Sequence, residues 1–209
     1  LIVTTFSETG FEKAVLAGGE TIAGGGVPDE FRLRFSEYLG RKSPSLEGGT
    51  LVEPILFSPP VYVFGAGHIS LSLCKIAALV DFNVTVIDDR PEFANAERFP
   101  EAHRIVVEPF EKAFDRLDFD GKEYVVIVTR GHAWDAVVLE EVMKRPAKYV
   151  GMIGSRRKTR VIMDHLKEKG VDPGRLASVR SPIGLPINAE TPEEIAVAIV
   201  AEMISVRRG

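Results

Sequence analysis

Residues Val61 to Asp89 read VYVFGAGHISLSLCKIAALVDFNVTVIDD, and this stretch decides the fold. An apolar run ends at Gly65-Ala66-Gly67, a segment with helically spaced apolar residues follows, and a second apolar run ends at Asp88. Strand, glycine turn, helix, strand and acidic residue in this order are typical of the first βαβ unit of a dinucleotide-binding fold. We therefore predict an α/β protein with a Rossmann-type, doubly wound parallel sheet.

Each part of this stretch predicts a contact with a nucleotide. Gly65 allows the tight turn, and Gly67 leaves room for a pyrophosphate at the positive end of the helix. His68 follows directly and would border the phosphates or a substrate. Asp88 is placed to accept hydrogen bonds from a ribose diol. Arg90 could instead pair with a 2′-phosphate, so NAD and NADP both stay open, with a lean toward NAD.

Two domains are expected, with a boundary at the stiff segment Ser58-Pro59-Pro60. Residues 1–58 predict a small, glycine-rich α+β domain, and residues 59–209 predict the nucleotide-binding domain. In the first we expect a strand at 1–6, one or two helical turns at 11–17, a helix at 28–39, and a strand at 50–57. Pro54 lies inside that last strand, so the pattern favours an edge strand.

The second domain continues with further strands and helices. Its apolar runs at 104–107, 124–129 and 148–153 predict strands, and the uninterrupted run at 124–129 is typical of a sheet covered on both faces. Short helices are expected up to Arg98 and at 110–117, and a turn at 171–174. Thr191-Pro192-Glu193-Glu194 has the cap, proline and acids of a helix start.

Ligands of doubly wound sheets bind at the carboxyl ends of the strands. Two later loops at such ends carry unusual side chains. Arg130 and His132 follow the strand at 124–129, and His132 could be an acid–base group, a phosphate ligand or a hydrogen-bond donor. Gly154, Ser155, Arg156 and Arg157 open a helix with cations at its positive end, which an anion would stabilise. These residues predict a second anion site.

Composition narrows the function. The 209 residues carry a net charge of −4, which gives no case for binding nucleic acid or acidic membranes. No apolar run is long enough to span a membrane, the start Leu1-Ile2-Val3 lacks the basic flank and the length of a signal peptide, and a cytoplasmic protein is expected. The start without methionine suggests a truncated or trimmed chain. Cys74 is expected to be buried, and no residues have metal-ligand or nucleophile spacing.

Five motifs together resemble one family. They are VYVFGAGHIS, VIDDRPEFANAERFPEA, VIVTRGHAWD, YVGMIGSRRKT and IGLPINAETPEEIAVAIVAEMI, in order between Glu53 and Ile204. The set is similar to the XdhC/CoxI accessory proteins of molybdenum hydroxylases. The resemblance implies a homodimeric chaperone that holds the molybdopterin cofactor, assists its sulfuration and delivers it to a xanthine dehydrogenase-like enzyme. A cysteine desulfurase is a further partner that it suggests.

Two departures limit what the resemblance transfers. The family often has Thr-His-x-His where this chain has Thr129-Arg130-Gly131-His132, so only the second histidine carries over. Residues 1–60 contain no cysteine, so a role for an N-terminal thiol does not transfer. An NAD(P)-dependent oxidoreductase and a nucleotide-sensing regulatory module stay as alternatives, although no catalytic residue can be assigned.

Overall fold

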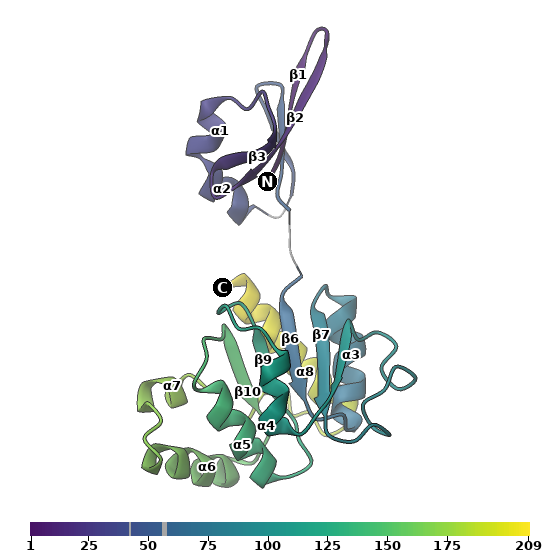
Figure 1. The fold of residues 1–209 in the computed structure, drawn as a ribbon, viewed down its shortest axis with the longest axis vertical. Helices are drawn as coiled ribbons and strands as arrows, with labels where there is room; N and C mark the ends of the chain where they lie inside the picture. Colours follow the sequence, from purple (N-terminus) through teal and green to yellow (C-terminus); the bar gives the residue numbers. More distant parts are fainter. Residues whose placement is uncertain (42, 56–57) are drawn as a thin grey trace. The chain divides into compact units, whose positions relative to one another are not determined.

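The computed structural model describes residues 1–41, 43–55 and 58–209. They fall into two compact units, Leu1–Phe57 and Ser58–Gly209 (Figure 1). The first unit contains an antiparallel sheet and the second a parallel one. The predicted α/β class, with a Rossmann-type sheet and a smaller α+β part, is therefore confirmed.

The sheet of the first unit has, in the described residues, five strands in the order β3-β2-β1-β5-β4. Their bounds are Ile2–Ser7 (β1), Gly10–Ala17 (β2), Glu20–Gly24 (β3), Ser45–Glu47 (β4) and Thr50–Glu53 (β5). Two helices, Asp29–Leu33 (α1) and Phe35–Gly40 (α2), pack on it through Phe31 and Tyr38, which are buried against Val3, Leu16 and Val52.

Three expectations for this unit were wrong. The segment 11–17 belongs to strand β2, because Ala14 and Leu16 alternate into the core and the chain pairs with β1. The helix expected at 28–39 is divided at Arg34, whose backbone leaves helical geometry and whose guanidinium bonds Glu37 and Glu47. The strand expected at 50–57 ends at Glu53 and lies between β1 and β4, not at an edge. Residues 56–57 lie outside the described residues.

The second unit has a five-stranded parallel sheet in the order β10-β9-β6-β7-β8, counted over the described residues. The chain moves from the central β6 to β7 and β8 and then returns across β6 to β9 and β10 (Figure 1). The topological switch point is therefore at β6. The strands are Pro60–Phe64 (β6), Asn83–Asp88 (β7), Arg104–Val107 (β8), Tyr124–Ile127 (β9) and Tyr149–Met152 (β10).

Helices cover both faces of this sheet (Figure 1). Val61 and Val63 point to the face that α3 and α8 cover, whereas Tyr62 and Phe64 point to the face of α4, α5 and α6. This alternation explains the uninterrupted apolar runs. The helices are His68–Leu79 (α3), Phe110–Ala113 (α4), His132–Val142 (α5), Arg156–Glu168 (α6), Pro173–Ala177 (α7) and Pro192–Arg208 (α8), with a 3₁₀ turn at Phe114–Arg116.

The local signals of α8 acted as expected. Thr191 caps it, with its side chain accepting from the backbone of Glu194 and the Glu194 carboxylate accepting in return. Two expectations were wrong in this unit. The segment before Arg98 forms turns instead of a helix, and Asp172, expected in a turn, caps the short helix α7. Among the described residues, no helix combines the length and apolar character needed to cross a membrane.

Candidate functional site

The strand ends that carry the expected site residues are level with one another. In the register of the sheet, Phe64 lies beside Ile87 and Ile127, and Ile127 lies beside Met152. The loops after β6, β7, β9 and β10 therefore leave the same edge of the sheet. The loop after β10 lies two strands, or about 10 Å, from the one after β6. The chain therefore folds as predicted in this respect, with the site loops at one edge of the sheet.

Gly65 and Gly67 serve different purposes in the glycine turn. Gly65 has φ +110°, and a Cβ there would lie 2.4 Å from the carbonyl oxygen of Val128. Glycine is therefore required because β6 and β9 approach closely. Gly67 is the N-cap of α3, and a Cβ there would meet no described atom within 4 Å. The helix N-terminus thus faces open space, as the phosphate-binding prediction requires.

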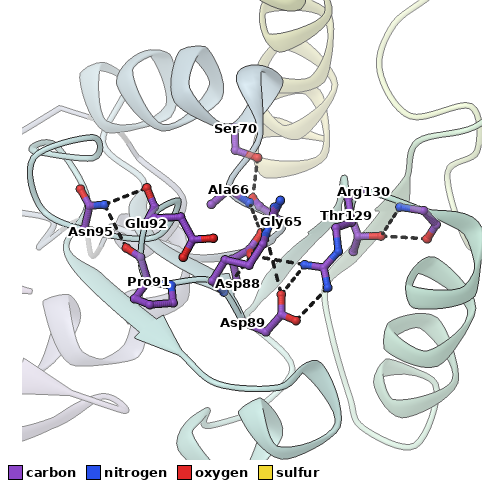
Figure 2. Close-up of polar contacts among 12 residues, drawn as sticks. Gly65, Ala66, Ser70, Asp88, Asp89, Pro91, Glu92, Asn95, Thr129 and Arg130 are labelled. Atoms are coloured by element: carbon purple, nitrogen blue, oxygen red, sulfur yellow. Dashed lines mark hydrogen bonds and ion pairs between the residues drawn. The ribbon is translucent and has the colours of Figure 1, made fainter.

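Ser70 fixes the turn from the helix side. Its hydroxyl is buried and donates to the carbonyl of Gly65 at 2.6 Å (Figure 2). The sequence pattern alone marks it only as a small residue at a position where glycine is common. The hydrogen bond gives serine a positive reason to be there. In the sequence, a hydroxyl residue five positions after the first glycine of the turn is the signal that could have predicted this hydrogen bond.

The side chain of Asp88 is buried against the backbone of the glycine turn. It is 1% exposed. One carboxylate oxygen accepts from the backbone N–H of Ala66 at 2.8 Å and from Arg90 Nη2 at 3.0 Å. The other accepts from the backbone N–H of Arg90 at 3.1 Å and from its Nε at 2.8 Å. Asp88 therefore ties the glycine turn to the loop after β7.

Arg90 is held in place on two sides. Its guanidinium grips Asp88 and also stacks on Phe93, with 3.8 Å between the guanidinium carbon and the ring centroid. The hydrogen bonds to Asp88 raise the pKa of Arg90. A guanidinium with this geometry is preorganised, so its position is fixed before any ligand arrives.

Asp89, which the sequence pattern does not single out, faces the loop after β9. Arg130 donates from Nη1 and Nη2 to its two carboxylate oxygens, the second at 2.8 Å (Figure 2). This hydrogen-bonded pairing with Arg130 lowers the pKa of Asp89 to about 2. Arg130 also approaches Asp88 at 3.7 Å and the ring of Trp134 at 5.6 Å. The ion pair thus spans from β7 to β9, past the end of β6.

The two predicted histidines open helices at this edge. His68 is the first residue of α3 and is exposed. His132 is the first residue of α5, and its side chain lies outside the described part of the structure. Behind it, Thr129 donates its hydroxyl to the buried Asp135 at 2.6 Å and fixes the loop that carries Arg130.

The predicted second anion site lies at the start of α6. Gly154 leads into Ser155, which caps the helix by accepting from the backbone N–H of Lys158 at 3.4 Å. Arg156 and Arg157 follow and are both exposed, and the first turn of α6 contains no acidic residue. Cations at a helix N-terminus oppose the helix dipole. An anion there would be favoured by both the dipole and the guanidinium groups.

The described residues bring no three His, Cys, Asp or Glu side chains together as a metal site. Cys74 is buried, and desolvation raises the pKa of its thiol to about 12. The thiol is therefore protonated at neutral pH and poorly nucleophilic. The chemistry of this edge is that of helix N-termini, cations and the partly exposed carboxylate of Asp89.

A glycine turn, an open helix N-terminus and a switch point at one sheet edge define a Rossmann-type domain. The chain belongs to the XdhC family, because residues 61–203 match the XdhC Rossmann domain. The resemblance seen in the five motifs is thereby confirmed.

Individual relatives agree with this assignment. The chain is 34% identical over 150 residues to the uncharacterized protein YqeB of Escherichia coli, covering 71% of this chain and 27% of YqeB. It is 31% identical over 157 residues to a probable xanthine dehydrogenase subunit from Bacillus subtilis, covering 75% of this chain and 44% of that protein. The chain thus spans less than half the length of these curated relatives.

A crystal structure described as a xanthine dehydrogenase from Bacillus halodurans superposes with a TM-score of 0.73. The sequences are 27% identical, and the match covers 99% of this chain and 61% of that one. The similarity therefore extends over both units of this chain.

Proposed function

We propose that this protein is an accessory factor that carries the molybdenum cofactor to a xanthine dehydrogenase-like molybdenum hydroxylase. The observation that carries the proposal is the open N-terminus of α3 behind Gly67, at the switch point of an XdhC-family domain. Two relatives, one named as a xanthine dehydrogenase and one as part of such an enzyme, support the choice of partner.

The phosphate of the pterin cargo has suitable donors at this edge. In the proposal it lies against Gly65, Gly67 and His68, where backbone N–H groups and the helix dipole favour an anion. Asp88 and Arg90 hold the turn from below.

In the proposal, Arg130 in the loop after β9 and His132 at the start of α5 contribute to the site. A second anionic group of the cargo is held by Gly154, Ser155, Arg156 and Arg157 at the start of α6, where two guanidinium groups are exposed. The cofactor is cargo in this scheme, so these residues bind it without turning it over.

Removing the two arginines of α6 tests this arrangement. Arg156→Ala with Arg157→Ala should weaken molybdopterin cofactor binding by a few kcal/mol, at roughly 1.5–3 kcal/mol for each charged hydrogen bond. AMP binding should change little, because AMP occupies only the glycine turn. Both affinities are measured by calorimetric titration.

A matched control removes the same charge from the other end of the helix. Lys167→Ala with Lys169→Ala takes away two exposed cations that pair with Asp164 and Glu140. It should leave both affinities near wild type. Equal losses of affinity for the cofactor and for AMP in the arginine variant would mean that the arginines act only through the general electrostatic field of the protein. Turnover of NAD(P)H with an acceptor would favour the oxidoreductase alternative.

A further inference from the structure

Asp88 ends β7 and Asp89 follows it directly, and the two carboxylates have different surroundings. Asp88 is 1% exposed, whereas the side chain of Asp89 is 24% exposed and faces the loop after β9. The sequence pattern assigns the ribose-binding role to Asp88, as the acid at the strand end. The geometry around the two side chains points to the other one.

Asp88 has no hydrogen-bonding capacity to spare. A carboxylate offers about four lone-pair positions. Asp88 receives four hydrogen bonds, one from the N–H of Ala66 and three from Arg90. A ribose hydroxyl could bond to it only by breaking one of them inside a buried network, which would leave a donor unsatisfied. Asp88 is therefore fully used by the protein itself.

Asp89 has fewer partners than Asp88 among the described residues: Arg130 donates hydrogen bonds to it, and Arg90 Nε approaches it only at 3.9 Å. Arg130 supplies both of its hydrogen bonds, so about two lone-pair positions are not taken by any described donor. The pair lies next to the glycine turn, since Arg130 also reaches to 3.7 Å from Asp88, which bonds Ala66 (Figure 2). With its pKa at about 2, the carboxylate is ionised at neutral pH and can accept from hydroxyls.

The guanidinium group of Arg90 is also occupied by contacts within the protein. Its Nε and Nη2 bind Asp88 and its face lies on Phe93. A 2′-phosphate would have to compete with a buried carboxylate for this guanidinium, and its charge would be set against Asp88 and Asp89. The neighbourhood of β7 therefore favours a ribose whose 2′-hydroxyl is free.

We propose that Asp89 binds the ribose diol of a nucleoside 5′-phosphate at the glycine turn, and that Asp88 is a positioning residue that holds the turn and Arg90. In this scheme Arg130 turns from Asp89 toward the phosphate of the ligand when the ligand enters. The inference goes beyond the proposed function, because molybdopterin itself contains no ribose, and it rests on that function's claim that the glycine turn binds phosphate.

The test compares AMP with 2′-deoxy-AMP by calorimetric titration of wild type, Asp89→Asn and Asp88→Asn. Wild type should bind AMP about tenfold or more tightly than 2′-deoxy-AMP, because a hydrogen bond to a charged group is lost. Asp89→Asn should bring this ratio close to one. Asp88→Asn should weaken both ligands together and keep the ratio. Adenosine 2′,5′-bisphosphate should bind wild type less tightly than AMP does.

Three results would overturn the inference. They are equal binding of AMP and 2′-deoxy-AMP by wild type, no binding of AMP at all, and a wild-type ratio that persists in Asp89→Asn. The last comparison decides the matter even where Asp88→Asn fails to fold, because Asp89 is partly exposed and its replacement is mild. If the ratio behaves as expected but no molybdopterin is ever bound, the cofactor-carrier proposal fails and the ribose assignment stands.

Discussion

At the scale of single residues, substitutions of Gly65 and Gly67 are expected to have opposite effects on stability and on AMP binding. Gly67→Val should leave the fold intact but abolish AMP binding, because its side chain would fill the open space in front of α3. Gly65→Ala should instead destabilise the fold by about 2–5 kcal/mol, through a clash with Val128 and a positive φ. Thermal unfolding and calorimetry of both variants check this. Unchanged AMP affinity in folded Gly67→Val would remove the phosphate site from the turn.

Cys74 is predicted to be a structural thiol. It is fully buried, and desolvation raises its pKa to about 12. Iodoacetamide should therefore fail to alkylate the native protein between pH 7 and about pH 10, and should react rapidly once denaturant is added. Mass spectrometry measures the modification. Rapid alkylation of the folded protein would show an accessible thiolate and would reopen a role for this cysteine in handling sulfur.

At the scale of elements, α8 offers a direct test of local sequence signals. It packs on α3 behind the glycine turn, and its start is fixed by the capping box of Thr191 and Glu194. Thr191→Ala should lower the free energy of unfolding by about 0.5–2 kcal/mol. Urea denaturation gives the value. A variant as stable as wild type would mean that packing alone sets the start of this helix.

Elements could be predicted where local chemistry agreed with tertiary packing. The βαβ unit and α8 carry strong glycine, capping and periodicity signals, and they form as expected. Segment 11–17 could not be predicted correctly from its local pattern. Phe11 fits an apolar position of a helix but is exposed in the structure, and pairing with β1 makes the segment a strand. Pro54 suggested an edge strand, but β5 ends at Glu53, so the proline never enters the sheet ladder.

The candidate site shows the same limit. The glycine turn and the basic start of α6 are visible in the sequence because their residue types are local. The difference between Asp88 and Asp89 is not visible in the sequence, because it depends on their hydrogen bonds to Arg90 and Arg130, which lie in different loops. Sequence spacing places an acid at the end of β7, and only the hydrogen bonds distinguish the buried carboxylate from the accessible one.

At the scale of the whole molecule, the two units contribute unequally to the proposed site. The parallel sheet of Ser58–Gly209 gathers the loops after β6, β7, β9 and β10 at one edge, and all the proposed ligand contacts lie there. The antiparallel unit Leu1–Phe57 supplies none of the proposed contacts. The proposed cargo site therefore lies in the XdhC-family unit.

The most direct test of the account measures what the protein carries. Wild type and Gly67→Val are purified in parallel from cells that make the molybdenum cofactor, and the released pterin is identified and quantified by mass spectrometry. The proposed function predicts molybdopterin bound to wild type in roughly stoichiometric amount and lost from folded Gly67→Val. Wild-type protein that carries no molybdopterin, or Gly67→Val that carries as much as wild type, would contradict it.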